Sequence, residues 1–264
     1  MHETQPTVFL IARPSIDIDG MRGYLQQVGG ESWLDRRLEE AGSTEALNGA
    51  QTLAEFGGRA CYRSWEPGLN ANVTRTRTDQ HEYFGNILAS AHGSVLEHAN
   101  FSFAFRNVSR VATHEIVRHR AGAAYSQESL RYVRLVDIGF RVPEVLEPLR
   151  NQVIEIVEKL EEFQRSAAEE LKLDEDGTPF HYKKEVTSAL RRLAPIGLST
   201  DIIVTMNART LRHVIEMRTA PGAEEELRTI FDQVAVIAQR EAPGLFQDFV
   251  KDEEGSWIPT HRKV

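Results

Sequence analysis

The chain has 264 residues, of which 41% are hydrophobic and 27% charged, a composition typical of a globular protein with a buried core. Its formal net charge of −8 disfavours binding to nucleic acid or to an anionic membrane, because the electrostatic contribution to such binding is repulsive on average. No run approaches the roughly 18 apolar residues of a transmembrane helix, and the first residues lack the pattern of a signal peptide. A single cysteine, Cys61, excludes an intrachain disulfide framework, so we expect a cytoplasmic protein.

The first half of the chain is predicted to be mainly helical, with two strands. A strand is indicated where apolar residues run together or alternate with polar ones, and a helix where they recur every three or four residues. In chain order the patterns predict a strand at 7–12, helices at 32–41 and 44–62, a loop at 64–72, a helix at 79–90, a strand at 100–107 and a helix at 110–120. The strand at 100–107 is the clearest, because Phe101, Phe103 and Phe105 alternate with smaller or polar residues.

The second half is predicted to contain two strands among long helices. In chain order the patterns predict a strand at 132–136, helices at 143–174 and 181–193, a strand at 200–205, and helices at 207–218 and 224–241. Residues 251–264 (KDEEGSWIPTHRKV) are predicted to be a poorly ordered tail after one domain that spans residues 1–250. Strands and helices that follow one another without regular βαβ alternation predict an α+β fold.

The densest group of ionisable and hydrogen-bonding side chains lies between residues 118 and 131. Arg118, Arg120 and Arg131 each present a planar fork of donors suited to phosphate, and small residues at 121–124 allow a backbone or a flat ring to approach. The alternative is a solvated basic helix end, which the helix dipole favours. The spacing alone does not separate a binding site from such a helix end.

Two further groups combine the residue types of a binding site. Helical spacing within 207–218 places Arg209 near His213, so that one face can present an arginine and an imidazole together. Residues 92–98 form a polar loop before the aromatic strand and can present His92 and Ser94 to a ligand. The alternatives are an exposed, salt-bridged helix for the first group and a structural histidine for the second.

Four blocks of the sequence resemble the flavin-dependent thymidylate synthase family in order and separation. They are GSVLEH at 93–98, RHR at 118–120, YSQESLRYV at 125–133 and NARTLRHVIEMR at 207–218. The resemblance extends over roughly residues 60–227 and centres on the family's signature of Arg-His-Arg, a spacer and Ser. It implies an α+β fold with a central, mostly antiparallel sheet flanked by long helices.

The resemblance assigns roles to individual residues of the matched blocks. Arg218 matches the arginine placed against the uracil ring, and it is therefore the expected catalytic residue. The positions that match cofactor-binding residues are His92, Ser94, Arg118, His119, Arg120, Asn207, Arg209 and His213. The positions that match substrate-binding residues are Glu115, Arg118, Gln127, Glu128, Ser129, Leu130, Arg131, Arg191 and Arg218.

The chain departs from the family pattern at three places. The spacer at 121–128 is one residue longer than in the commonest form of the signature. His213 stands where some members have Asn, and residues 219–226 lack the histidine that many members have there. These departures leave the contacts of the loop at 121–124 and the packing of the flavin beyond Arg218 open.

The resemblance implies methylation of uracil C5, which converts dUMP to dTMP with FAD as cofactor and with methylenetetrahydrofolate and NADPH as co-substrates. It also implies a homotetramer with active sites at subunit interfaces. Cys61 lies outside every matched block and is expected to be a small buried residue, so no enzyme thiol is expected to attack the ring. Arg218 would stabilise negative charge on the uracil instead, while Ser129, which has no base placed beside it by the sequence, would position the substrate and His119 would contact a ligand.

Three alternatives remain at the level of sequence. The first is the same chemistry on UMP, as in relatives of the family that methylate a ribonucleotide. The second is a metal-dependent hydrolase using His92, His98, His114 and His119, although the spacing from His114 to His119 is one residue too long for His-Glu-x-x-His. The third is a flavin- or nucleotide-binding protein without activity. No metal site is expected in the first or third case.

Overall fold

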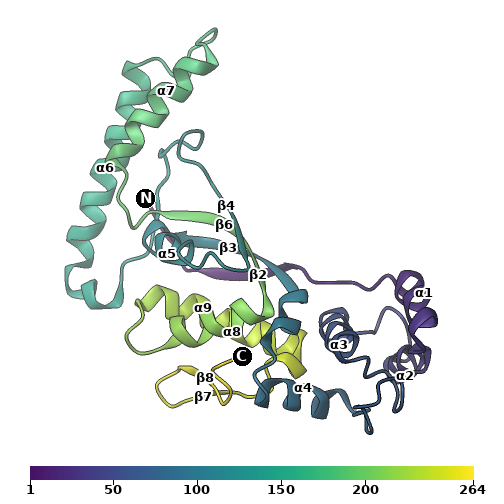
Figure 1. Cartoon of the computed structure of the whole chain (residues 1–264). Coiled ribbons are helices and arrows are strands. Elements are labelled where there is room, and N and C mark those ends of the chain that lie inside the picture. The colour runs from purple at the N-terminus through teal and green to yellow at the C-terminus, as the bar shows by residue number, and fades with distance from the viewer.

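A computed structural model describes all residues, 1–264, and its centre is a four-stranded antiparallel sheet (Figure 1). The strand order is β2-β3-β6-β4, and the strands are β2 Thr7–Ala12, β3 Asn100–Ser109, β6 Ser199–Asn207 and β4 Ala123–Gln127. The predicted α+β fold is confirmed. The two central strands come from predicted segments nearly 100 residues apart, with Phe103 opposite Val204.

One face of the sheet is buried by two helices, α8 (Ala208–Thr219) and α9 (Glu225–Glu241) (Figure 1). Phe101, Phe103 and Phe105 of β3 are 0–1% exposed and point to this face, as the alternation predicts. The opposite face is open. It presents a row in which Phe9 and Ile203 flank Ala104, with 50% and 38% of the Phe9 and Ile203 side chains exposed.

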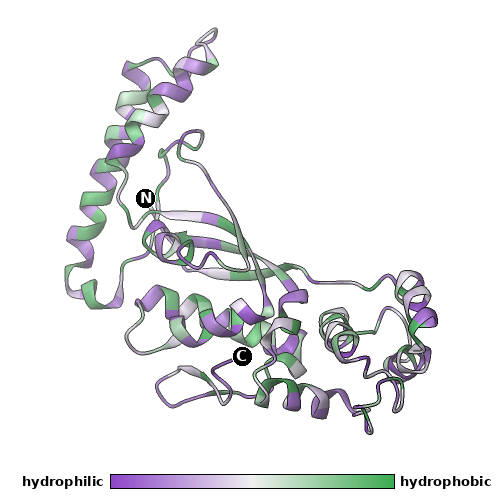
Figure 2. Ribbon diagram, viewed as in Figure 1, coloured by the Kyte–Doolittle hydropathy of each residue, from purple (hydrophilic) through white to green (hydrophobic).

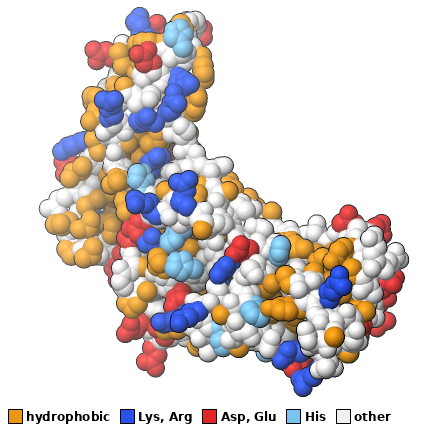
Figure 3. All heavy atoms as spheres, in the orientation of Figure 1, with side chains coloured by type: hydrophobic (Ala, Val, Ile, Leu, Met, Phe, Trp, Pro, Cys, Tyr) orange, Lys and Arg blue, Asp and Glu red, His pale blue; other side chains and the backbone are white.

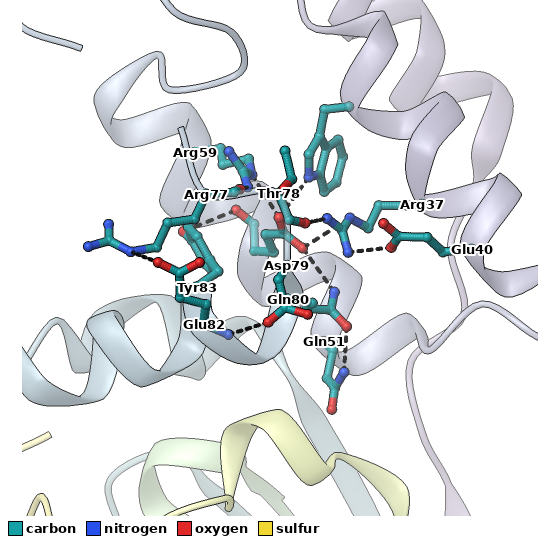
Figure 4. A network of polar contacts seen from close by, with 12 residues as sticks. Arg37, Glu40, Gln51, Arg59, Arg77, Thr78, Asp79, Gln80, Glu82 and Tyr83 are labelled. Carbon is teal, nitrogen blue, oxygen red and sulfur yellow. Dashed lines mark hydrogen bonds and ion pairs between the residues drawn. The ribbon is translucent and has the colours of Figure 1, made fainter. Parts of the chain in front are cut away.

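The segment before β3 forms a helical unit beside the sheet. Its elements are α1 Ile18–Val28, α2 Glu31–Ala41, α3 Gly49–Tyr62, α4 Gln80–Ala89 and the 3₁₀ helix η1 Gly93–His98. A fully buried carboxylate, Glu55, joins these helices: it accepts hydrogen bonds from Trp33 Nε1, Arg59 Nε and Gln80 Nε2 at 2.7–2.9 Å. Figure 4 shows how Arg37, Arg59 and Gln80 converge on this network. Because a buried charge must be paired, the network holds α2 and α4 against α3.

The segment between β4 and β6 forms a helical hairpin that projects away from the sheet (Figure 1). Its elements are β5 Gly139–Phe140, η2 Glu144–Leu149, α6 Arg150–Glu170, α7 Phe180–Leu190 and η3 Arg191–Leu193, and β5 pairs with β1 His2–Glu3. Both hydrophilic and hydrophobic stretches lie along α6 and α7 (Figure 2). Ile156 and Phe180 are 60% and 70% exposed. No helix of the chain is both long enough and apolar enough to cross a membrane.

Most predicted elements are confirmed within a few residues, and three expectations are wrong. Residues 132–136 form no strand, because Leu135 turns into a small core with Leu130 and Ile138 instead of pairing with the sheet. The helix predicted at 110–120 is α5 Arg110–Ile116, which ends early because the following residues turn towards α8. Neither α1 nor β4 is predicted from the sequence.

The third wrong expectation is the poorly ordered C-terminal tail. Residues after α9 form η4 Pro243–Leu245 and a hairpin of β7 Phe249–Lys251 and β8 Trp257–Pro259. Trp257 is 8% exposed and packs on the main core, and its backbone N–H donates to Thr219 Oγ1 at 2.9 Å. Burial of this indole holds the segment on the protein, so its many charged residues did not make it disordered.

Candidate active site

Arg218, near the end of α8, is held by two residues of the segment around the Arg-His-Arg motif. Its Nε donates to His119 Nε2 at 2.9 Å, its Nη1 donates to Glu115 Oε2 at 2.6 Å, and its Nη2 donates to the Glu115 carbonyl at 3.4 Å. Only 15% of the Arg218 side chain is exposed. Three donors used in this way fix the plane of the guanidinium and leave its other N–H groups for a ligand.

The path of the chain after α5 brings His119 to Arg218. Ser109 caps α5 by accepting from the Ala112 N–H, and the helix ends at Ile116. The Tyr125 hydroxyl then lies within hydrogen-bond distance of the carbonyls of both Ile116 and His119, which share its single hydrogen, and this contact ties the end of α5 to strand β4. The turn that results projects the imidazole of His119 away from the helix axis and towards α8.

His119 is a neutral hydrogen-bond acceptor at neutral pH. Burial, the Arg218 charge and the neighbouring His213 together lower the pKa of His119 from 6.5 to about 4. Because Nε2 accepts from Arg218, the proton of the neutral ring resides on Nδ1. The rings of His119 and His213 meet edge to face, with centroids 6.1 Å apart.

His119 and His213 line an open cavity of about 510 Å³ between the Arg-His-Arg segment, α8 and the C-terminus. Arg218, Glu115 and Arg118 do not line it, and Arg218 is joined to it through its hydrogen bond to His119. Five of the eight residues predicted to bind the cofactor line it: His119, Arg120, Asn207, Arg209 and His213. Further lining residues are Glu97, Ala121, Gly122, Thr210, Arg212, Glu216, Pro259, His261, Arg262 and Val264. Histidine side chains lie among those of Lys or Arg across the middle of the face shown in Figure 3.

The long spacer of the signature docks on the first turn of α8. Gly122 has a φ of +68°, and a Cβ at this position would collide with the side chains of Asn207 and Thr210. Asn207 caps α8 by accepting from the Thr210 N–H at 2.8 Å, and Thr210 Oγ1 donates to the Ala121 carbonyl at 2.8 Å. Glycine at residue 122 therefore permits the close approach that closes one side of the cavity.

His92 and Ser94 do not line this cavity, but their loop contributes to it. His92 is exposed, and its ring stacks on that of Tyr62 with centroids 5.7 Å apart. Ser94 is exposed at the start of η1. Glu97, from the same turn, does line the cavity and pairs with Arg209 at 2.6 Å. Glu97 lies within the matched block GSVLEH, but neither its spacing nor the resemblance assigns it a role.

Five of the nine residues predicted to bind the nucleotide, Gln127 to Arg131, lie at the end of β4 and directly after it. Gln127 Nε2 donates to Thr113 Oγ1 at 3.1 Å, and Glu128 accepts from Thr200 Oγ1 at 3.3 Å. The Leu130 side chain is 6% exposed in a separate apolar cluster, so only its backbone is placed to contact a ligand. The exposed candidates are Arg118, Glu128, Ser129, Arg131 and Arg191.

Arg110 is a neighbour of Arg191 that the sequence did not reveal. Burial lowers its pKa, the Arg191 charge lowers it further, and Glu128 acts in the opposite direction. Its Nη1 is buried without a hydrogen-bond partner. Two arginines near one carboxylate form a local excess of positive charge suited to an anion, and only their positions in the fold bring them together.

Some predicted substrate-binding residues line a separate, smaller hollow of about 230 Å³, which contains Glu128 and Leu130. A hollow of about 730 Å³ lies between the edge strand β2 and α9. Cys61, expected to be buried, is instead exposed at the end of α3 and does not line the cavity. Nowhere do three His, Cys, Asp or Glu side chains gather as ligands for a metal ion.

The fold and the site define an α+β protein that presents a fixed arginine and several further basic side chains beside a cavity. The family model described as "Thymidylate synthase complementing protein" matches residues 44–244. The chain belongs to this family, which confirms the resemblance seen in the four sequence blocks.

Relatives of the chain are enzymes named flavin-dependent thymidylate synthase. The chain is 36% identical over 216 residues to the one from Mycolicibacterium gilvum (strain PYR-GCK) and 37% identical over 213 residues to the one from Mycolicibacterium vanbaalenii. It is 34% identical over 211 residues to the one from Mycobacterium tuberculosis (strain ATCC 25177 / H37Ra). Each comparison covers 78% of this chain and 82% of the relative.

Proposed function

We propose that the chain is an FAD-dependent methyltransferase that converts dUMP to dTMP with methylenetetrahydrofolate and NADPH. The observation that carries the proposal is the placement of Arg218, fixed by neutral His119 and by Glu115 beside a basic cavity. The names of the relatives support thymidylate synthesis and a flavin. The choice of FAD, the folate and NADPH follows the family resemblance.

The residues around the cavity fit a flavin dinucleotide. Arg120 and Arg209 offer guanidinium forks for a pyrophosphate, and the edges of His119 and His213 offer hydrogen-bonding groups for a flat ring system. Gly122 also lines the cavity, and the absence of a side chain there lets its loop pack against Asn207 and Thr210. The cavity volume of about 510 Å³ falls within the roughly 300–1,000 Å³ of ligand pockets.

In the proposed reaction reduced flavin, when bound, supplies the reducing equivalents and helps transfer the one-carbon unit, with NADPH as the electron source. Arg218 binds the carbonyl edge of the uracil and stabilises the negative charge that develops on the ring as C5 becomes nucleophilic. Neutral His119 orients the guanidinium without adding a second positive charge beside it. Glu115 fixes the other side of the guanidinium.

The proposed mechanism uses no enzyme cysteine. Cys61 is the chain's single cysteine, and it lies at the C-terminal end of α3, outside the residues that line the cavity. Electrostatic stabilisation by Arg218 takes the place of covalent activation by a thiolate in this proposal. Ser129 has no neighbouring base and is assigned to substrate positioning.

We also propose that the active protein is a homotetramer with its sites at subunit interfaces. Two surfaces support this: the open face of the sheet, with Phe9 and Ile203, and the projecting hairpin, with Ile156 and Phe180. Exposed apolar side chains grouped on such surfaces are typical of protein interfaces. The molar mass of the purified protein, measured by light scattering after gel filtration, tests this proposal.

The test of the activity follows flavin absorbance and nucleotide mass. The protein is reconstituted with FAD and treated with NADPH in the absence of nucleotide, with dUMP, or with UMP, and methylenetetrahydrofolate is then added. Bleaching of the flavin followed by the gain of one methyl group on dUMP is the expected result. Methylation of UMP instead would identify a ribonucleotide methylase, and failure to bind FAD would refute the proposal.

A further inference from the structure

The C-terminal segment is fixed across α8 by a buried ion pair. Arg212, 4% exposed, donates from Nη1 and Nη2 to the two carboxylate oxygens of Asp248 at 2.7 and 2.9 Å. Burial opposes ionisation of Asp248, but the bonds from Arg212 outweigh it and lower the pKa of this carboxyl. The His261 backbone N–H donates to the Asp248 carboxylate at 3.0 Å, and the His261 carbonyl accepts from Arg212 Nη2 at 3.2 Å. The backbone at residue 261 therefore has a defined position.

This anchoring carries the last residues of the chain into the cavity beside Arg218. Pro259, His261, Arg262 and Val264 line the cavity opposite the Arg-His-Arg segment. Val264 lies against Gly93, where a Cβ would collide with the Val264 carbonyl carbon and approach Arg209 Nε to 2.9 Å. Residues 245–264 lie beyond the range 44–244 that the family model matches, so this wall is additional to the matched site.

Arg262 adds a third exposed guanidinium to the cavity. Its Nε pairs with Glu216 Oε1 at 3.0 Å, while 63% of its side chain remains exposed. Arg120 and Arg209 line the same cavity from two other segments, and Arg209 is likewise held by one carboxylate, Glu97. An arginine oriented through one nitrogen keeps its remaining N–H groups for a phosphate, to which guanidinium groups bind strongly.

We propose that Pro259, His261, Arg262 and Val264 form one wall of the flavin site and that Arg262 binds the pyrophosphate of FAD together with Arg120 and Arg209. This inference rests on the proposed function, because it requires a flavin dinucleotide in the cavity. The competing explanation is that Arg262 serves only to tie the C-terminus to α8 through Glu216. The two explanations differ in their effect on FAD affinity and on its dependence on salt.

The test compares Arg262→Gln with Lys263→Gln in the full-length protein. Both variants lose one positive charge, but Lys263 is exposed and does not line the cavity. The FAD dissociation constant is measured by quenching of flavin fluorescence at several salt concentrations, and thermal unfolding of both apoproteins is recorded. Arg262→Gln is expected to weaken FAD binding about tenfold to a hundredfold, the range for a charged hydrogen-bonding group, and to reduce its salt dependence. Lys263→Gln is expected to bind FAD like the wild type.

Several outcomes would overturn the inference. Equal FAD affinity in Arg262→Gln and the wild type would show that Arg262 does not bind the cofactor. Removal of residues 260–264 should also weaken FAD binding, and tighter binding after this truncation would show that the segment blocks the site. A wild-type protein that binds no flavin would refute the proposed function itself, which is a different result from normal binding in every variant.

Discussion

Replacement of Arg218 by Gln tests the central contact of the site, because the wild-type guanidinium affects both His119 and the proposed substrate. In the folded protein the pKa of His119 is lowered to about 4 by burial, by Arg218 and by His213. The variant removes the charge of Arg218 and leaves burial and the neighbouring His213. The pKa of His119 should therefore rise, yet stay below its ordinary value of 6.5.

The same variant separates catalysis from stability. Glu115 is 41% exposed, so water can solvate its carboxylate when the arginine is lost and unfolding should change little. If Arg218 stabilises charge on the uracil, kcat should fall by roughly 10²–10³, the usual cost of losing a preorganised donor. A large loss of activity with a nearly unchanged melting temperature is the expected combination.

Nuclear magnetic resonance titration measures the pKa directly, with His119→Gln used to assign one resonance among the nine histidines. Since the folded-state pKa lies below the unfolded value, the unfolded chain binds more protons between about pH 6.5 and 4. The free energy of unfolding should thus decrease as the pH falls through this window, and decrease less in Arg218→Gln. A wild-type His119 that titrates near 6.5, or one whose pKa is the same in both proteins, would refute the reasoning.

Three further predictions concern single residues. Gly122→Ala places a Cβ against Asn207 at a residue whose φ is +68°. It should lower the free energy of unfolding by about 2–3 kcal/mol, because the left-handed backbone is strained with alanine and the helix cap at Asn207 is weakened. Urea denaturation measures this loss, and a loss below about 0.5 kcal/mol would contradict the prediction. Cys61→Ser should leave kcat unchanged, and a large loss would restore a role for the thiol. Arg110→Gln should raise KM for the nucleotide about tenfold at constant kcat if Arg110 and Arg191 bind its phosphate, and an unchanged KM would exclude Arg110 from the site.

Part of the site could be predicted because Arg209, His213 and Arg218 belong to a helix with a clear pattern. Helical spacing placed Arg209 and His213 on one face of 207–218, and both line the cavity. The alternation of Phe101, Phe103 and Phe105 located the central strand that positions α5. Periodicity reports which side chains share a surface, and the family resemblance was needed to assign that surface to a binding site.

The parts that the sequence did not reveal depend on contacts between distant segments. Strand β4 carries small and polar residues without alternation, and it is a strand because β6 offers an edge to pair with. The C-terminal residues are polar, and they are ordered through Trp257 and through the pairing of Arg212 with Asp248. The residue types of a segment do not show which distant residues it will contact in the folded protein.

The helix α8 explains why segments so far apart in sequence meet in one site. Its cap residue, Asn207, receives the spacer loop at Gly122; its middle residue, Arg212, receives the C-terminus; and its last turn, through Arg218, receives His119. The buried side of the same helix packs on the sheet, so the three segments all contact one helix that is held rigidly in the core. A longer spacer can then be absorbed in the loop at 121–124 without displacing Arg218, because the two are attached to opposite ends of the helix.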